Sequence, residues 1–232
     1  MKKVITIILV LLSSVVLYGQ EITDELWLRA VELKMSSTQV YPTQSEYRSI
    51  TKDKKGKVEE EESIFISHTE EDGDIINKFI SGSNSRGEID EDYETVQRYL
   101  SINVISEEKG IFQTTLSDKF SLKRESDEKI EGIEYAKYKM KMKTDKDGKK
   151  IDSEGYVWID KARGVPFKLV LDIDPDQKMV KKLQSSTYYS LTDEGYLVST
   201  KSETEIEVSV VIKRIFMTQI VNRSNFKKLE KI

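Results

Sequence analysis

Apolar and polar residues alternate along most of the second half of the chain. The clearest run is 138–143, in which Tyr138, Met140 and Met142 alternate with lysines. A period of two predicts a strand with one buried and one wet face. By this criterion the predicted strands are 138–143, 155–160, 167–173, a segment within 182–191, 196–201, 203–212 and 215–220.

Polar segments with glycine separate these strands, at 145–148, 161–164 and 193–195. Turns between successive alternating strands indicate an antiparallel meander. A long series of such strands favours a strongly curved sheet or a barrel, because sheets twist and their edges need cover. The predicted class is therefore mainly β with some helix (α+β).

The first half of the chain begins with a helical pattern over 24–35. Leu26, Trp27, Ala30, Val31 and Leu33 fall on one face, and acidic residues suit the helix start. The pattern further on predicts strands at 46–51, 61–67, 74–80, 102–106 and 111–116, a loop at 81–88 and a helix at 89–100.

The first twenty residues are typical of a signal peptide. Lys2 and Lys3 precede an apolar run over 4–16, which is short for a membrane span but sufficient for a leader. We expect residues 1–20 to be removed and 21–232 to form a single exported domain; the alternative is an anchor retained at 4–18. Without cysteine the chain has no disulfide and no lipidation site. The expected location is the periplasm, if the source is Gram-negative.

The overall charge argues against nucleic acid as a partner. There are 37 Lys and Arg against 41 Asp and Glu, a net charge of -4. Nucleic-acid binding needs a clustered basic face. The net charge also gives no reason to expect steering toward an anionic membrane.

Two motifs that could carry chemistry lack essential groups. His68 is the only histidine, so neither a zinc site built on several histidines nor a catalytic triad is expected, and His68 is interpreted as a polar residue at a sheet edge. Gly82 and Gly87 have the spacing of a phosphate loop, but Glu88 and Ile89 stand where Lys and Ser or Thr would bind. A flexible loop is expected instead.

The acidic groups also lack the features of a site. Asp172, Asp174 and Asp176 imitate part of a calcium loop, but Gln177 replaces its glycine and Leu183 its bidentate glutamate. The runs 59–62 and 90–94 are expected to be solvated. We therefore expect no catalytic residue, no metal, no cofactor and no enzymatic activity.

Several aromatic residues lie on or near the predicted strands. They are Tyr156, Trp158, Phe167, Tyr188 and Tyr189. Core packing is one interpretation, and the lining of an apolar cavity is the other.

One longer segment carries a family resemblance. Residues 155–171 read GYVWIDKARGVPFKLVL, and they are followed by 195–198, 203–211, 212–216 and a closing Asn222-x-x-x-Phe226. This order over about 135–229 resembles the LolA/LolB-like superfamily of periplasmic lipoprotein-sorting and lipid-binding proteins. The resemblance implies a strongly curved antiparallel sheet forming an open half-barrel, with a few covering helices around a cavity for acyl chains. Trp158, Asp160 and Pro166 match as markers of the fold, and no ligand-binding residue is carried over.

The expected function is a periplasmic carrier or binding protein for a lipid or a lipid-modified protein. On this hypothesis, Tyr138, Met140 and Met142 line a cavity rather than fill a closed core. The alternative is a non-catalytic sensor or protein-interaction module on the same fold, with an envelope protein as partner.

Overall fold

The computed structural model describes residues 21–101, 111–146, 149–174, 179–210 and 213–229. The expected leader, 1–20, and the expected strand 102–106 lie outside them. The described part contains the helices α2 (Glu25–Ser36) and α3 (Glu94–Leu100). No helix within it is long and apolar enough to cross a membrane.

Every strand of the described part belongs to one antiparallel sheet. The strands are β1 (Val40–Asp53), β2 (Val58–Glu71), β3 (Asp74–Asn84), β4 (Gly87–Glu88), β5 (Phe120–Arg124), β6 (Glu128–Ile130), β7 (Ile133–Lys146), β8 (Lys149–Asp160), β9 (Pro166–Ile173), β10 (Val180–Leu191), β11 (Leu197–Val210) and β12 (Lys213–Lys228). The mainly β, antiparallel prediction with covering helices is confirmed.

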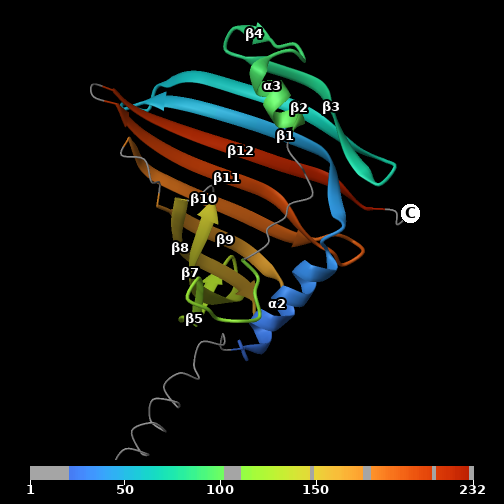
Figure 1. Cartoon of the computed structure of the whole chain (residues 1–232), viewed down its shortest axis with the longest axis vertical. Helices are drawn as coiled ribbons and strands as arrows, with labels where there is room; N and C mark the ends of the chain where they lie inside the picture. The colour runs from blue at the N-terminus through green and yellow to red at the C-terminus, as the bar shows by residue number, and fades with distance from the viewer. Residues whose placement is uncertain (1–20, 102–110, 147–148, 175–178, 211–212, 230–232) are drawn as a thin grey trace, which may run out of the picture.

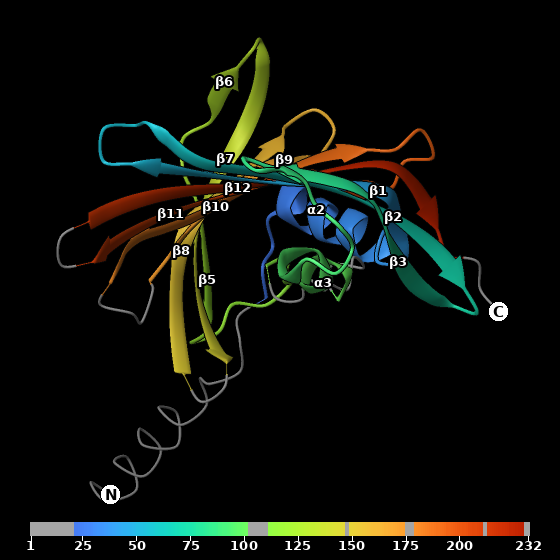
Figure 2. The same ribbon diagram turned by 90° about the horizontal axis from the view of Figure 1, so that it is seen from above.

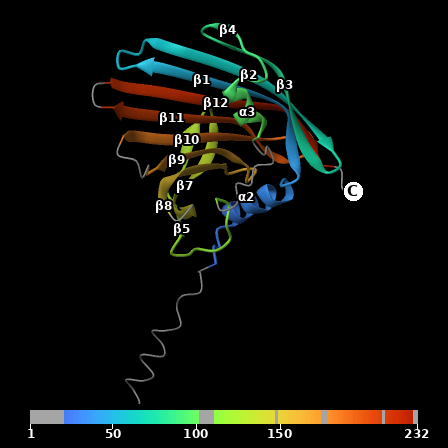
Figure 3. The same cartoon turned by 45° about the horizontal axis from the view of Figure 1, so that its top comes forward.

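The order across the sheet is β4-β3-β2-β1-β12-β11-β10-β9-β8-β7-β5, with β6 also paired to β7. Figure 3 shows this order from β4 at the top to β5 at the bottom. The pairing of β1 with β12 runs from Val40↔Lys228 to Asp53↔Ile215 and joins the first strand to the last. The sheet is thus continuous from one edge to the other, and the β1–β12 pair joins the strands of the first half to the meander of the second half.

The sheet is neither closed nor strongly curled, so the strong curvature expected of a half-barrel is not found. Curvature requires bulges that bend strands. The central pairs β1–β12 and β11–β12 keep their register throughout, although bulges occur elsewhere, for example between Phe65 and Ile66. The centre of the sheet therefore lacks the bends that would close it.

Both helices lie on the same side of the sheet (Figures 1 and 2). Helix α2 forms because Asp24 caps it: its Oδ1 accepts the backbone N–H groups of Leu26 at 3.1 Å and Trp27 at 3.2 Å. The helix then buries Trp27, Ala30 and Val31 against the sheet. The face that carries the two helices is called the helix-bearing face below.

Four local predictions are corrected by the structure. Residues 111–116 form only an isolated bridge at Thr115, because Phe112 turns inward to stack on Trp27 at 5.5 Å. The helix expected over 89–100 begins only at Glu94. The expected loop 81–88 contains the end of β3 and all of β4. Two strands expected over 196–212 are one continuous strand in the structure, β11.

Candidate functional site

Helix α2 covers a packed core and not a cavity. Tyr138 and Met140 are each 1% exposed, and the Tyr138 ring lies 5.5 Å from the Trp27 ring. Met142 packs at the margin of the same cluster. The hypothesis that these residues line a cavity is therefore wrong for Tyr138 and Met140, since α2 fills the space in front of them.

The tyrosine under α2 also ties the helix start to the sheet. Its hydroxyl donates to Asp24 Oδ1 at 2.7 Å, the atom that caps the helix. Burial, and then this bond to Asp24, raise the pKa of Tyr138 far above its ordinary value. The hydroxyl thus stays protonated and serves as a structural donor.

Helix α3 covers a second, smaller core, and His68 lies beside it. His68 is 2% exposed; its Nδ1 lies 2.8 Å from Asn77 Oδ1, and its Nε2 lies 2.8 Å from Ser45 Oγ. Asn77 donates to the carbonyl of Leu100 at the end of α3. The expectation of an edge residue is wrong, because β2 lies inside the sheet, between β1 and β3.

The environment of His68 favours its neutral form. Burial lowers its pKa, the bond to Asn77 opposes this, and the charge of Arg223 lowers it further. The imidazole therefore acts as a neutral link between β1, β2 and β3, and no second histidine exists to complete a metal site.

An apolar patch on the helix-bearing face belongs to neither core. Opposed residues of neighbouring strands share a face, and the register aligns Leu183 with Ile206, Ile206 with Met217, and Val208 with Ile215. All five side chains are partly exposed. We call these residues, Leu183, Ile206, Val208, Ile215 and Met217, the uncovered patch.

No described helix packs on the uncovered patch. The C-terminal end of helix α2 contacts the first residue of β11, Leu197. The Oγ atom of Ser37, which caps the helix, accepts the N–H of Leu197 at 2.7 Å. Ile206 lies about 30 Å further along β11, at 3.3 Å per residue. Figures 1 and 2 show β10, β11 and β12 running past both helices toward their hairpin tips. The patch is therefore an apolar part of this face that no described helix covers.

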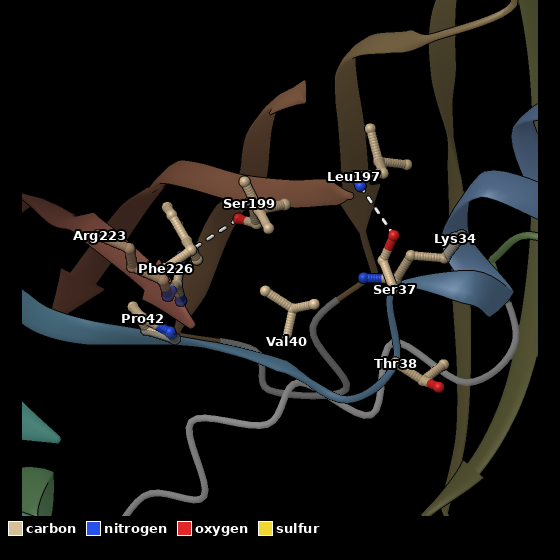
Figure 4. A pocket seen from close by; sticks show the side chains of 10 residues that line it. Lys34, Ser37, Thr38, Val40, Pro42, Leu197, Ser199, Arg223 and Phe226 are labelled. Carbon is tan, nitrogen blue, oxygen red and sulfur yellow. Dashed lines mark hydrogen bonds between the residues drawn. The ribbon is translucent and has the colours of Figure 1, made fainter. Parts of the chain in front are cut away.

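Polar residues lie between the uncovered patch and the end of α2 on β11 and β12. Arg223 Nη1 donates to Ser199 Oγ at 3.2 Å and to Ser202 Oγ at 3.0 Å. The crevice beside it, between the end of α2 and β11, holds only about 40 Å³ (Figure 4). That volume suits about one water molecule and cannot take an acyl chain.

The face opposite to the helices carries most of the aromatic residues singled out in the sequence. Lys137 Nζ lies 4.6 Å from the Tyr156 ring and 5.1 Å from the Trp158 ring, and Lys168 Nζ lies 4.9 Å from the Tyr188 ring. The Trp158 indole donates to Glu128 at 2.9 Å. These rings are covered by lysine side chains, and they line no apolar cavity.

Two further aromatic residues have different surroundings. Phe167 lies 4.9 Å from Tyr135, between their ring centroids, near the same group. Tyr189 points to the other face and joins the core under α2. The register of β10 with β11 shifts between Tyr188 and Tyr189, at the point where the two neighbouring tyrosines lie on opposite faces of the sheet.

The remaining acidic and glycine motifs build no site in the described part. Gly82 and Gly87 flank the β3–β4 hairpin, and Asp172 accepts a bond from Gln184 Nε2 at 2.7 Å. Asp176 lies outside the described residues. Within them, no three His, Cys, Asp or Glu side chains are grouped so as to hold a metal ion.

The run 59–62 was expected to be solvated, and this holds only in part. Glu59 pairs with Lys213 at 2.8 Å and Glu61 pairs with Arg48. Glu62 instead points toward α3, where its Oε1 is buried and accepts no hydrogen bond from a described residue. Burial, and then the charge of Glu60, raise the pKa of Glu62.

The residues that carry the family resemblance have structural surroundings. Asp160 is buried at the β8–β9 turn and accepts the N–H groups of Ala162 at 2.9 Å and Arg163 at 3.1 Å. Burial raises its pKa, but the Arg163 side chain and these two N–H groups outweigh it and lower the pKa overall. Pro166 is fully buried where β9 starts. These residues fix a turn, as the sequence led us to expect.

A groove on the opposite face is large enough for part of a ligand. It measures about 400 Å³ and is lined in part by Phe65, Ile80, Gln44, Glu46 and Asn222. Phe65 is 41% and Ile80 53% exposed, next to the outer edge of β3. No pattern in the sequence predicts this groove, because it arises where a bulge bends β2 against β3.

Comparison with solved structures gives one match to report. The Pseudomonas aeruginosa MucA/MucB complex matches with 8% identity and a TM-score of 0.25, over 88% of this chain and 98% of that chain. A likeness at this level carries no argument about function. No family model matches, and no curated protein matches.

Proposed function

We propose that the protein is an exported, non-catalytic binding protein that holds an acyl chain, of a lipid or of a lipid-modified protein, on the uncovered patch. The observation that carries this proposal is the row of partly exposed aliphatic side chains from Leu183 to Met217, on the face that elsewhere forms both cores. The resemblance of 155–171 to the LolA/LolB-like superfamily agrees with it.

The energetic basis is the removal of two apolar surfaces from water. Each methylene that an acyl chain buries contributes about 0.8 kcal/mol. The patch crosses three strands, which are about 4.8 Å apart, so it extends about 10 Å across the sheet. That extent accommodates part of one chain, and the patch needs no movement of α2 or α3 to admit it. Binding and release are therefore expected without opening of the helices.

The test is extraction of the protein after expression from its full sequence and purification without detergent. Organic extraction followed by mass spectrometry is expected to recover acyl lipid in a stoichiometric amount. The Ile206→Asp variant should fold with an unchanged circular dichroism spectrum and lose this lipid. A protein free of lipid that also takes up no fluorescent fatty acid contradicts the proposal.

The second candidate is a protein-interaction module that uses the edge of β3. Strand β4 pairs only with Ser83 and Asn84, which leaves most of the outer edge of β3 without a neighbouring strand in the described part. An extended segment of an envelope protein could add to this edge and place a side chain in the groove beside Phe65 and Ile80. Loss of binding to such a segment in Ile80→Asp, with lipid uptake unchanged, would favour this function.

A further inference from the structure

The tip of the β1–β2 hairpin carries an unusual concentration of positive charge. Residues 52–57 read KDKKGK, four lysines and one aspartate. Lys54, Lys55 and Lys57 are exposed, and none of the four lysines forms an ion pair with a residue that the structure describes. This local charge contrasts with the net charge of -4 for the chain.

The aspartate at this tip is occupied by the turn itself. Asp53 Oδ1 accepts the backbone N–H of Lys55 at 2.8 Å and of Lys57 at 2.9 Å, and Gly56 takes a φ of 80°. These groups are what the turn geometry requires. The turn does not require lysine at the other positions, so turn formation does not explain the clustered charge.

The basic residues of the neighbouring hairpin differ from those of the tip. Lys213 pairs with Glu59 at 2.8 Å, and Arg214 pairs with Glu207 at 3.1 Å. Their charges are balanced by carboxylates within the sheet. Of these basic residues, those of the β1–β2 tip are thus the ones without an ion pair to a described residue; one exposed carboxylate, Glu60, lies beside them on β2, opposite Thr51.

The tip borders directly on the uncovered patch. Asp53 is paired with Ile215, and Thr51 with Met217, both members of the patch. At about 3.3 Å per residue, positions 54–57 lie roughly 5–10 Å beyond this row. A lysine side chain that bends back from the tip thus reaches the region just beyond the end of an acyl chain on the patch. An apolar surface bounded at one end by cations matches the two parts of an anionic amphiphile.

We propose that the β1–β2 tip is a headgroup site, and that the ligand is an acyl lipid with an anionic, phosphate-bearing headgroup. This inference rests on the proposed function, because the acyl chain occupies the uncovered patch. Lys54, Lys55 and Lys57 bind the phosphate as mobile point charges, while the patch takes the chain.

The test compares fluorescent phosphatidylglycerol and phosphatidylcholine analogues, which share acyl chains and differ in headgroup charge. The wild-type protein should prefer the phosphatidylglycerol analogue. The Lys54→Gln, Lys55→Gln, Lys57→Gln triple variant should lose on the order of 100-fold in affinity for it, since each lysine near an anionic lipid contributes about fivefold. Its affinity for phosphatidylcholine should not change.

The matched control is a triple variant that removes the same charge elsewhere. Lys123, Lys129 and Lys227 are exposed and lie on other strands. Their substitution by glutamine should leave the preference intact. Increased salt should reduce the preference of the wild-type protein, because exposed charges are screened.

The possible results separate the two proposals. Equal uptake of both analogues by the wild-type protein overturns the headgroup site and leaves the acyl site standing. No uptake of either analogue overturns both. Displacement of phosphatidylglycerol by inorganic phosphate as effectively as by unlabelled lipid overturns the headgroup assignment, because the tip would then bind phosphate regardless of its acyl chain.

Discussion

Two methionines on the helix-bearing face provide a matched test of the difference between the packed core under α2 and the uncovered patch. Met140 is 1% exposed beneath α2, whereas Met217 is partly exposed in the uncovered patch. Substitution by alanine removes the same atoms at both sites. At Met140 it leaves a cavity in a packed core, which costs about 2–5 kcal/mol of unfolding free energy. At Met217 the cost should stay below about 1 kcal/mol.

The assay is urea denaturation of the lipid-free protein, followed by tryptophan fluorescence. For a dependence of about 2 kcal/mol per molar urea, Met140→Ala should lower the midpoint by about 1–2.5 M and Met217→Ala by less than about 0.5 M. Trp27 lies in the core under α2, so its emission reports on that core directly. If Met140→Ala leaves the midpoint unchanged, or if both variants shift it equally, the distinction between core and patch is refuted.

Three further variants test individual contacts. A Cβ at Gly155 would lie 1.9 Å from the Val170 carbonyl oxygen, so Gly155→Ala should cost about 3 kcal/mol or more in urea denaturation. The pKa of His68 is lowered in the folded protein, so the unfolded chain binds more protons below about pH 6.5. The free energy of unfolding should therefore fall by up to about 1.4 kcal/mol for each pH unit below that value. The His68→Asn variant should lack this pH dependence. Asp160→Asn loses the charged partner of Arg163 and should lower the thermal midpoint by a few degrees; an unchanged midpoint would contradict this role.

The regular alternation in the second half predicts strands well, because burial of one face requires it. The runs at 138–143, 155–160 and 167–173 all lie in strands of the sheet. The pairing of β1 with β12 could not be predicted in the same way. It joins Val40 to Lys228, far apart in the chain, and no local pattern encodes a partner at that distance.

The alternation of apolar and polar residues also predicts which face of the sheet a side chain lies on. It does not predict which other part of the chain covers that face. Met140 and Met217 share one face of the sheet, but only the position of α2 decides that the first is buried. Similarly, the sequence identifies His68 as a lone histidine, whereas its burial depends on β3 lying beyond β2. The uncovered patch was therefore missed, because its members look like ordinary core residues in the sequence.

The glycine and the aspartate of the β1–β2 turn satisfy its local geometry. Its charge was not recognised as a feature, because the net charge of -4 averages over the whole chain. Only the register of Asp53 with Ile215 places the lysines next to the aliphatic row. The role of a local group of charges depends on the residues that lie beside it in space, and these residues are known only from the fold.

The most direct test of the acyl-binding account is photo-crosslinking with a fatty acid that carries a diazirine at the end of its chain. After irradiation and proteolysis, mass spectrometry identifies the labelled peptides. The account predicts labels on β10, β11 and β12, around Leu183, Ile206 and Met217, and their loss in Ile206→Asp. Labels around Phe65 and Ile80 instead, or no label above that of a denatured control, would contradict it.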